Sequence, residues 1–191
     1  MFDQFRNNFP LDDSKWHEYT SYFNRMEVPA KTILLEEGEI SKKLFIIEKG
    51  CIRVWVNTNG KDITTQFFFE NQSVASIESF IKKFPSPVVV ETIEPSVLWW
   101  IHKKDVDLII EDIKDIPALR DRFINKLFER TFDYMKHFVS FIKDSPTQRY
   151  LNLIEERPQI PYRVPQHYIA SYLGVSKVHL SRIKSKLLHE K

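Results

Sequence analysis

The hydrophobic pattern of the chain changes its period twice, near Val28 and near Lys104, and these changes limit the fold more than any other feature. Before Lys104, six short runs rich in β-branched and aromatic residues are separated by turn residues, as in an antiparallel sandwich or barrel. The runs are Thr32–Leu35, Leu44–Glu48, Ile52–Val56, Ile63–Phe69, Val88–Ile93 and Val97–Ile101. Residues 11–26 have the apolar spacing of a short helix, and the spacing after Lys104 is helical again. The sequence therefore predicts an α+β protein with an antiparallel β part.

The longest helical stretch begins at Pro117, a residue that fits the first turn of a helix. Its apolar positions recur at steps of three and four residues, which form one side of a helix. They are Ile124, Leu127, Phe128, Thr131, Tyr134, Met135, Phe138, Phe141 and Ile142. This is more apolar surface than one contact within the chain requires, so we expect a homodimer through residues 117–143. A helix fully buried in its own chain is the alternative.

Charge is distributed unevenly along the chain. Residues 1–116 carry 14 Lys/Arg against 19 Asp/Glu, whereas residues 145–191 carry 8 against 3, a net charge of +5. Ser145 and Pro146 form a helix cap followed by a helix-opening proline. We therefore expect three parts: residues 1–116, a helix over 117–144, and a basic domain over 145–191. A basic domain favours nucleic acid as partner, although a solvated basic surface is the alternative.

The segment Gln166–Ser185 has the spacing of a helix-turn-helix. Ala170 is the small residue where two helices cross, Gly174 supplies the left-handed turn, and Leu180 and Ile183 are structural apolar positions. Ser176 is expected to cap the second helix. The predicted DNA-binding residues are Ser176, Lys177, His179, Ser181, Arg182, Lys184 and Lys186. Donors and cations on one helix face suit a major groove and its phosphates, whereas a two-helix hairpin of unrelated purpose is the alternative.

With these features in order, the chain resembles the Crp/Fnr family of transcription regulators. The segment Gly38–Gly50 (GEISKKLFIIEKG) looks like that family's barrel signature, and the long helix and helix-turn-helix follow it. The resemblance implies a cyclic-nucleotide-binding-like jelly roll, a dimerisation helix and a C-terminal winged-type helix-turn-helix. It also implies a homodimer that binds double-stranded DNA at a two-fold-symmetric operator and responds to a small-molecule effector. RNA polymerase is a further candidate partner.

The segment that would hold a cyclic phosphate departs from the family pattern. The family's cyclic-nucleotide binders carry a Gly-Glu and an Arg-Ser pair near residues 74–87, but this stretch contains no arginine. Lys82 and Lys83 do not replace it, because a lysine ammonium cannot make the bidentate hydrogen bonds of a guanidinium to phosphate. We therefore expect an effector other than cyclic AMP. The candidate effector-pocket residues are Ser76, Glu78 and Ser86.

Two further departures concern the C-terminal domain. Lys177 and Val178 replace the Arg-Glu pair with which the family reads bases, so we expect a different operator. The sequence ends soon after Leu188, so a wing would have to come from residues around Ile160–Val164.

Other classes of protein find little support in the sequence. There is neither a signal peptide nor an apolar run near the ~20 residues that span a bilayer, and the one cysteine, Cys51, cannot form an internal disulfide, so we expect a cytoplasmic protein. The six histidines are scattered, and no catalytic arrangement is recognisable, so we expect no metal, no cofactor and no enzyme activity. Two alternatives stay open. One is a small-molecule-sensing signalling module that acts through protein interaction, and the other is a cupin-type metalloenzyme.

Overall fold

The computed structural model describes residues 2, 6 and 11–189. It contains two antiparallel sheets followed by helices, so the predicted α+β class is confirmed. The strands are β1 (Asn24–Val28), β2 (Ile33–Leu35), β3 (Lys43–Lys49), β4 (Ile52–Thr58), β5 (Lys61–Phe68), β6 (Ser73–Val74), β7 (Val89–Thr92) and β8 (Ser96–His102). The helices are α1 (Asp13–Ser21), α2 (Ile77–Lys82), α3 (Lys103–Ile113), α4 (Pro117–Lys143), α5 (Pro146–Glu156), α6 (Ile160–Arg163), α7 (Gln166–Tyr172) and α8 (Lys177–His189).

The β part is a jelly roll of two four-stranded sheets. One sheet has the order β1-β8-β3-β6 and the other the order β2-β7-β4-β5. Every pairing between neighbours is antiparallel. The inner faces bury one apolar core, to which both sheets contribute in alternation. Its buried members are Leu35, Phe45, Ile47, Ile52, Val54, Phe68, Val74, Val90 and Leu98.

The turn between β4 and β5 shows how local sequence sets the register of this sheet. Asn59 and Gly60 both have positive φ angles, 53° and 77°, as the tightest hairpin turns require. The strands on either side pair residue by residue from Thr58 and Lys61 as far as Trp55 and Thr64, and the register then shifts by one residue before Val54 pairs with Gln66. This pairing places Ile52 and Val54 inward and Arg53 outward, so β4 has an apolar inner face and a polar outer position.

One predicted boundary was wrong, and two short elements were not predicted. The first helix, expected over residues 11–26, ends at Ser21, and Asn24–Val28 instead form the edge strand β1. Met26 pairs with Leu98 of β8 and packs on the inner core, so packing against the sheet overrides the helical spacing of the apolar residues. The short strand β6 and the helix α2 were not predicted, and both are shorter than the window in which periodicity is visible.

The expected wing around Ile160–Val164 is also wrong. These residues form the helical turn α6, with a proline in its first turn and the N–H of Val164 donating to the carbonyl of Ile160 (2.9 Å). Within the described residues 145–189 there are helices and no strand. The C-terminal part is therefore a helical unit without a wing.

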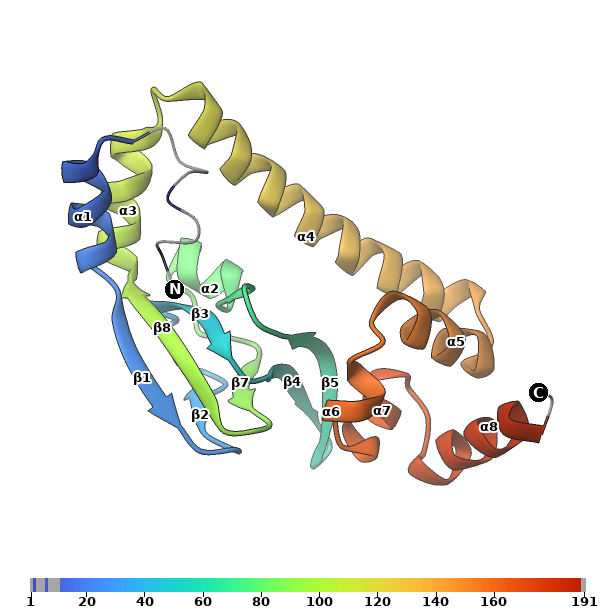
Figure 1. Cartoon of the computed structure of the whole chain (residues 1–191). Coiled ribbons are helices and arrows are strands. Elements are labelled where there is room, and N and C mark those ends of the chain that lie inside the picture. The colour runs from blue at the N-terminus through green and yellow to red at the C-terminus, as the bar shows by residue number, and fades with distance from the viewer. Residues whose placement is uncertain (1, 3–5, 7–10, 190–191) are drawn as a thin grey trace.

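Helix α4 connects the jelly roll to the C-terminal helices (Figure 1). Only Leu119 of this helix is buried, and a long run of its apolar side chains is exposed to solvent. At the far end of α4 the chain turns back, so that α7 lies beside β5 (Figure 1). The C-terminal helices thus contact both α4 and the outer face of a sheet.

A second apolar core joins the C-terminal helices to the jelly roll. Cys51, Phe67, Phe69 and Ile93 supply the jelly-roll side of this core. The side supplied by the C-terminal helices consists of Tyr150, Leu153, Ile160, Val164, Tyr168, Ile169, Ala170, Tyr172, Leu173, Leu180 and Ile183. The orientation of α7 and α8 is therefore set by burial against the outer face of the β2-β7-β4-β5 sheet.

Candidate nucleic-acid interface

The turn between α7 and α8 is built around Gly174. Its φ angle is +67°, a conformation that side chains with a Cβ rarely adopt, and the N–H of Val175 donates to the carbonyl of Ala170 (2.9 Å). A Cβ at Gly174 would also stand 2.7 Å from a ring carbon of Phe141 in α4. The turn therefore requires glycine at this position for two reasons, the positive φ angle of its backbone and its close approach to α4.

The residues expected to hold the two helices together lie inside the second core. Ala170 is 2% exposed, Leu180 is 0% exposed and Ile183 is 4% exposed. The small side chain of Ala170 lets α8 cross α7 closely, while Leu180 and Ile183 share one side of α8. This leaves the opposite side of α8 facing solvent.

The solvent-facing side of α8 carries the predicted DNA-binding residues. Lys177, His179, Ser181, Arg182 and Lys186 are exposed, and Lys184 is half-buried. The hydroxyl oxygen of Ser176 accepts a hydrogen bond from the N–H of His179 (3.1 Å), so Ser176 caps the helix. From Lys177 to His189 the sequence has four lysines and arginines and no acidic residue, so this side of the helix is cationic.

A shallow hollow of about 420 Å³ lies between the first turn of α5 and the exposed side of α8. Thr147 lines it from α5, and Val178, Arg182 and Lys186 line it from α8. Sequence reasoning missed Thr147, because only the fold brings the start of α5 beside α8. A hydroxyl next to two cations can bind a phosphate group of a nucleic acid backbone.

Two arginines, Arg53 and Arg163, hold the C-terminal helices on the jelly roll. Arg53 is 4% exposed and contacts Glu91 (2.8 Å) and Asp62 (2.6 Å), and its guanidinium lies 3.8 Å from the centre of the Tyr168 ring in α7. Arg163 donates two hydrogen bonds to Glu70 (2.7 and 2.8 Å) and also pairs with Glu94. The bonds from Arg163 lower the pKa of Glu70 to about 2. These contacts fix α7, and with it α8, relative to β4 and β5.

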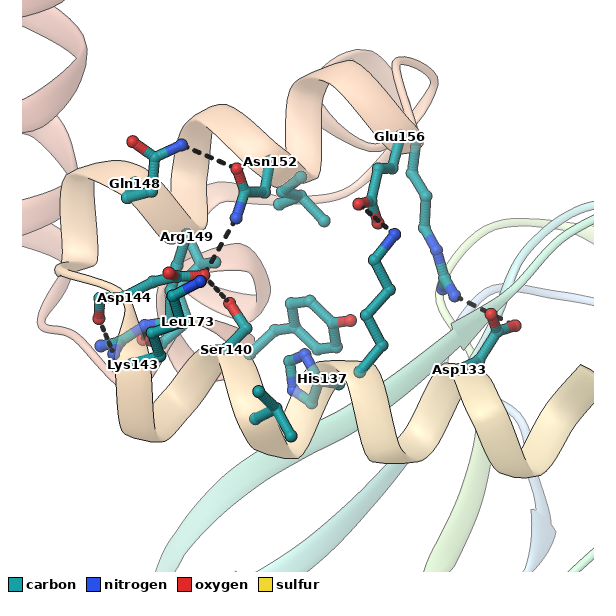
Figure 2. A pocket seen from close by; sticks show the side chains of 15 residues that line it. Asp133, His137, Ser140, Lys143, Asp144, Gln148, Arg149, Asn152, Glu156 and Leu173 are labelled. Atoms are coloured by element: carbon teal, nitrogen blue, oxygen red, sulfur yellow. Dashed lines mark hydrogen bonds and ion pairs between the residues drawn. The ribbon is translucent and has the colours of Figure 1, made fainter.

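A polar hollow of about 460 Å³ lies where α4 meets α5 and α7 (Figure 2). His137 of α4 stacks on Tyr172 of α7 with ring centres 4.2 Å apart. Burial, together with the nearby Arg157 and Arg149, lowers the pKa of His137 to about 4, so the ring is neutral at pH 7. Arg149 donates to the backbone carbonyls of Asp144 and Leu173. This hollow is a joint between α4 and the C-terminal helices.

The three candidate effector residues do not all come together. Ser76 and Ser86 are buried, and the hydroxyl of Ser86 donates to that of Ser76 (2.9 Å). Glu78 instead lies on the exposed side of α2, where it pairs with Lys82 one helical turn away. The sequence placed these residues in one segment, but the helical period of α2 separates Glu78 from the two serines.

Two polar side chains that sequence reasoning missed have buried groups near the inner core. Arg130 reaches from α4 to the jelly roll, where it donates to the carbonyl of Ser73 (2.8 Å) and lies 4.5 Å from the centre of the Phe68 ring. Gln66 pairs with the inward-facing Val54. In the described part of the chain, the Nε and Nη2 atoms of Arg130 and the Nε2 atom of Gln66 are buried without a hydrogen-bond partner. Arg130 could not be found from residues 74–87, since it comes from α4.

Other chemistry has few candidates in the described residues. Over residues 2, 6 and 11–189, no three His, Cys, Asp or Glu side chains form a group that could hold a metal ion. In the same range no helix is both long and apolar enough to cross a membrane. Cys51 is fully buried in the second core, and burial raises the pKa of its thiol.

Comparison with known proteins identifies the jelly roll. Residues 25–112 match the family of cyclic nucleotide-binding domains. This range includes all eight strands except the first residue of β1, together with α2 and most of α3. No protein of curated function matches the sequence of the chain.

Solved structures extend the likeness beyond the cyclic nucleotide-binding domain. The c-di-GMP-responsive global regulator CLP of Xanthomonas campestris has a TM-score of 0.74 at 16% identity, over 94% of this chain and 93% of its own. FixK2 of Bradyrhizobium japonicum has a TM-score of 0.73 at 12% identity, over 88% and 85%. A Crp/Fnr-family regulator of Eubacterium rectale has a TM-score of 0.72 at 18% identity, over 97% and 89%. The chain therefore has the fold of a Crp/Fnr regulator, C-terminal helices included.

Proposed function

We propose that the chain is a homodimeric transcription regulator that binds double-stranded DNA in a sequence-specific way. The observation that carries the proposal is the two-sided character of α8. Leu180 and Ile183 are buried on one side, and the other side exposes hydrogen-bond donors and cations, Lys177 and Arg182 among them. An exposed helix of this composition matches the major groove, where base edges accept hydrogen bonds and phosphates line both rims.

The proposed partner of α4 is a second copy of the chain. Phe128, Met135, Phe138 and Ile142 are all exposed and fall on one side of the helix. The opposite side contains Arg130 and His137, which contact the rest of the same chain. A dimer through residues 117–143 would bury the apolar side and present two copies of α8. Their half-sites would be about 34 Å apart, one turn of DNA.

The proposed effector site is the interior of the cyclic nucleotide-binding domain, within residues 1–116, with α4 closing one side. The buried N–H groups of Arg130 and Gln66 can donate to acceptor atoms of a bound molecule. Because Arg130 comes from α4, an effector that it holds would bias the helix at the dimer interface and so the spacing of the two DNA-binding domains over residues 145–191. An effector other than cyclic AMP stays our prediction, because residues 74–87 have no arginine. Calorimetry showing micromolar binding of cyclic AMP would contradict it.

The test of DNA binding is a selection from random double-stranded DNA with the purified full chain, followed by titration of the enriched sequence at increasing salt. We expect one enriched sequence with two-fold symmetry and an affinity that falls steeply as salt rises, because phosphate contacts release counterions. A Lys177→Ala/Arg182→Ala double variant should lose most of this affinity. Lys104→Ala, at an exposed lysine of α3, is the matched control and should bind as the wild type does.

Absence of any enriched sequence, with no binding even in dilute buffer, would overturn the proposal. In that case α8 would act on a protein, and the chain would be a signalling module that senses a small molecule and acts through protein interaction. RNA polymerase, the further candidate partner, would be tested separately by transcription from a promoter that carries the enriched sequence.

A further inference from the structure

The exposed side of α8 contains one side chain that its surroundings do not explain. The structure describes every residue from Lys177 to Lys186. Within this range Val178 is the one exposed apolar side chain, with 61% of its surface accessible. Its neighbours on that side are lysine, histidine, serine and arginine. A valine in this position contributes nothing to the core and has no hydrogen-bonding group, so its side chain is free to make an apolar contact with whatever α8 binds.

The position of Val178 on α8 places it away from the second core. At about 100° per residue, Val178 lies opposite the direction of the buried pair Leu180 and Ile183. Arg182 and Lys186 follow it at one and two helical turns, and these three residues line the same hollow beside Thr147. Val178 is also the second residue of the helix, and recognition helices contact base edges chiefly with their N-terminal residues.

The major groove offers one apolar group to such a side chain. Guanine, adenine and cytosine present hydrogen-bond donors and acceptors, and thymine adds its C5-methyl group. A branched aliphatic side chain set among cations that hold the backbone matches this methyl and matches no polar base edge. We propose that Val178 packs on the C5-methyl of one thymine in each half-site, and that it selects thymine over cytosine there. This inference rests on the proposed DNA binding.

The test removes only the methyl group from the DNA. In the operator enriched by the wild type, each thymine is replaced in turn by deoxyuridine, and the dissociation constant is measured by fluorescence anisotropy at one salt concentration. We expect one thymine per half-site at which the replacement weakens binding about four-fold, the size expected for one buried methyl group. The remaining thymines should tolerate the replacement.

The matched variants assign this effect to Val178. Val178→Ala keeps a good helix former at the position, and it should bind the thymine and deoxyuridine operators equally. Ser185→Ala, at another exposed position of α8 that is outside the predicted DNA-binding set, should keep the full four-fold difference. Circular dichroism of both variants checks that α8 is retained.

The outcomes separate the two proposals. An enriched operator in which every thymine tolerates deoxyuridine would overturn the role of Val178 and leave DNA binding intact. The same holds if Val178→Ala stays as sensitive to the missing methyl as the wild type. Failure to enrich any operator would overturn the proposed function, and the role of Val178 with it.

Discussion

The exposed faces of helices α4 and α8 differ in composition. On α4 the exposed face is apolar, with Phe138 67% exposed and Ile142 72% exposed. On α8 it carries several cations, and Val178 and Leu188 are its exposed apolar side chains. Both faces lie opposite the side that packs on the rest of the chain. Since each face is laid out at helical spacing over several turns, each matches an extended surface rather than a small molecule.

The difference in composition indicates two different partners. An apolar face of this length is best covered by another apolar face, and a second copy of the same helix supplies one. A face of lysines and arginines gains nothing from apolar contact, but it neutralises phosphates. The two faces are also linked, because the turn at Gly174 packs on Phe141 of α4. A substitution in one face, or in the contacts that support it, therefore tests whether the other face responds.

The largest effect is expected from a charge on the α4 face. Phe138→Glu would place two carboxylates in the dimer seam, and burying an unpaired charge costs several kcal/mol. We expect the dimer to dissociate, with a loss of affinity on the order of 100-fold or more, and DNA binding to fall with it because a monomer holds one half-site. Sedimentation equilibrium and anisotropy measure the two effects.

The control for this variant places the same charge elsewhere on α4. Asn125→Glu lies on an exposed position outside the apolar side, and it should leave the dimer intact. A Phe138→Glu variant that stays dimeric at micromolar concentration would show that the apolar face of α4 has another role.

A smaller effect is expected from removing one cation of the α8 face. Arg182→Ala should leave the dimer unchanged and weaken operator binding by about 1–3 kcal/mol if Arg182 reads a base. In that case the preference for one base pair should also relax. If Arg182 contacts only phosphate, binding to all sequences should weaken alike and the salt slope should fall by about one. Unchanged affinity would remove Arg182 from the interface.

Sequence reasoning succeeded where a feature repeats along one element. The apolar period predicted α4, and the spacing of Ala170, Gly174 and Leu180 predicted α7, the turn and α8. It failed where a contact between distant segments decides the structure. Met26 is in a strand because β8 lies beside it, and Arg130 reaches the jelly roll because α4 passes β6. The separation of Glu78 from Ser76 and Ser86 was missed for a local reason, because α2 was not recognised as a helix.

The contacts that hold α8 on the jelly roll should weaken at low pH, whereas the apolar contact of α4 in the proposed dimer should not. Arg163 holds the pKa of Glu70 at about 2, below its ordinary 4.5, so the unfolded chain binds the proton more readily than the folded one. The stability due to this pair is complete above about pH 5 and is lost as the pH falls toward about 2. Because the pair is partly exposed, its contribution at pH 7 is discounted to about 1–2 kcal/mol.

Urea denaturation of the wild type and Glu70→Gln measures this contribution. We expect the difference in unfolding free energy to be largest at pH 7 and to shrink below about pH 4.5, while the dimerisation constant of the wild type stays constant over the same range as long as the chain is folded. A difference that does not depend on pH would show that ionisation of Glu70, which both Arg163 and the N–H of Gly50 favour, does not contribute to stability.

The smallest effect is expected from substitutions at Ser176, which distinguish the stability of α8 from its contact with DNA. Ser176→Ala removes the acceptor for the N–H of His179 and should cost about 1 kcal/mol of unfolding free energy. Ser176→Asp keeps an acceptor at the same place, so the chain should stay as stable as the wild type, yet it adds a negative charge beside Lys177. If the α8 face contacts phosphates, Ser176→Asp should therefore bind DNA more weakly than Ser176→Ala does, although it is the more stable of the two. The opposite order would mean that the N-terminal end of α8 does not approach the DNA backbone, and that the cations further along the helix make the contact without it.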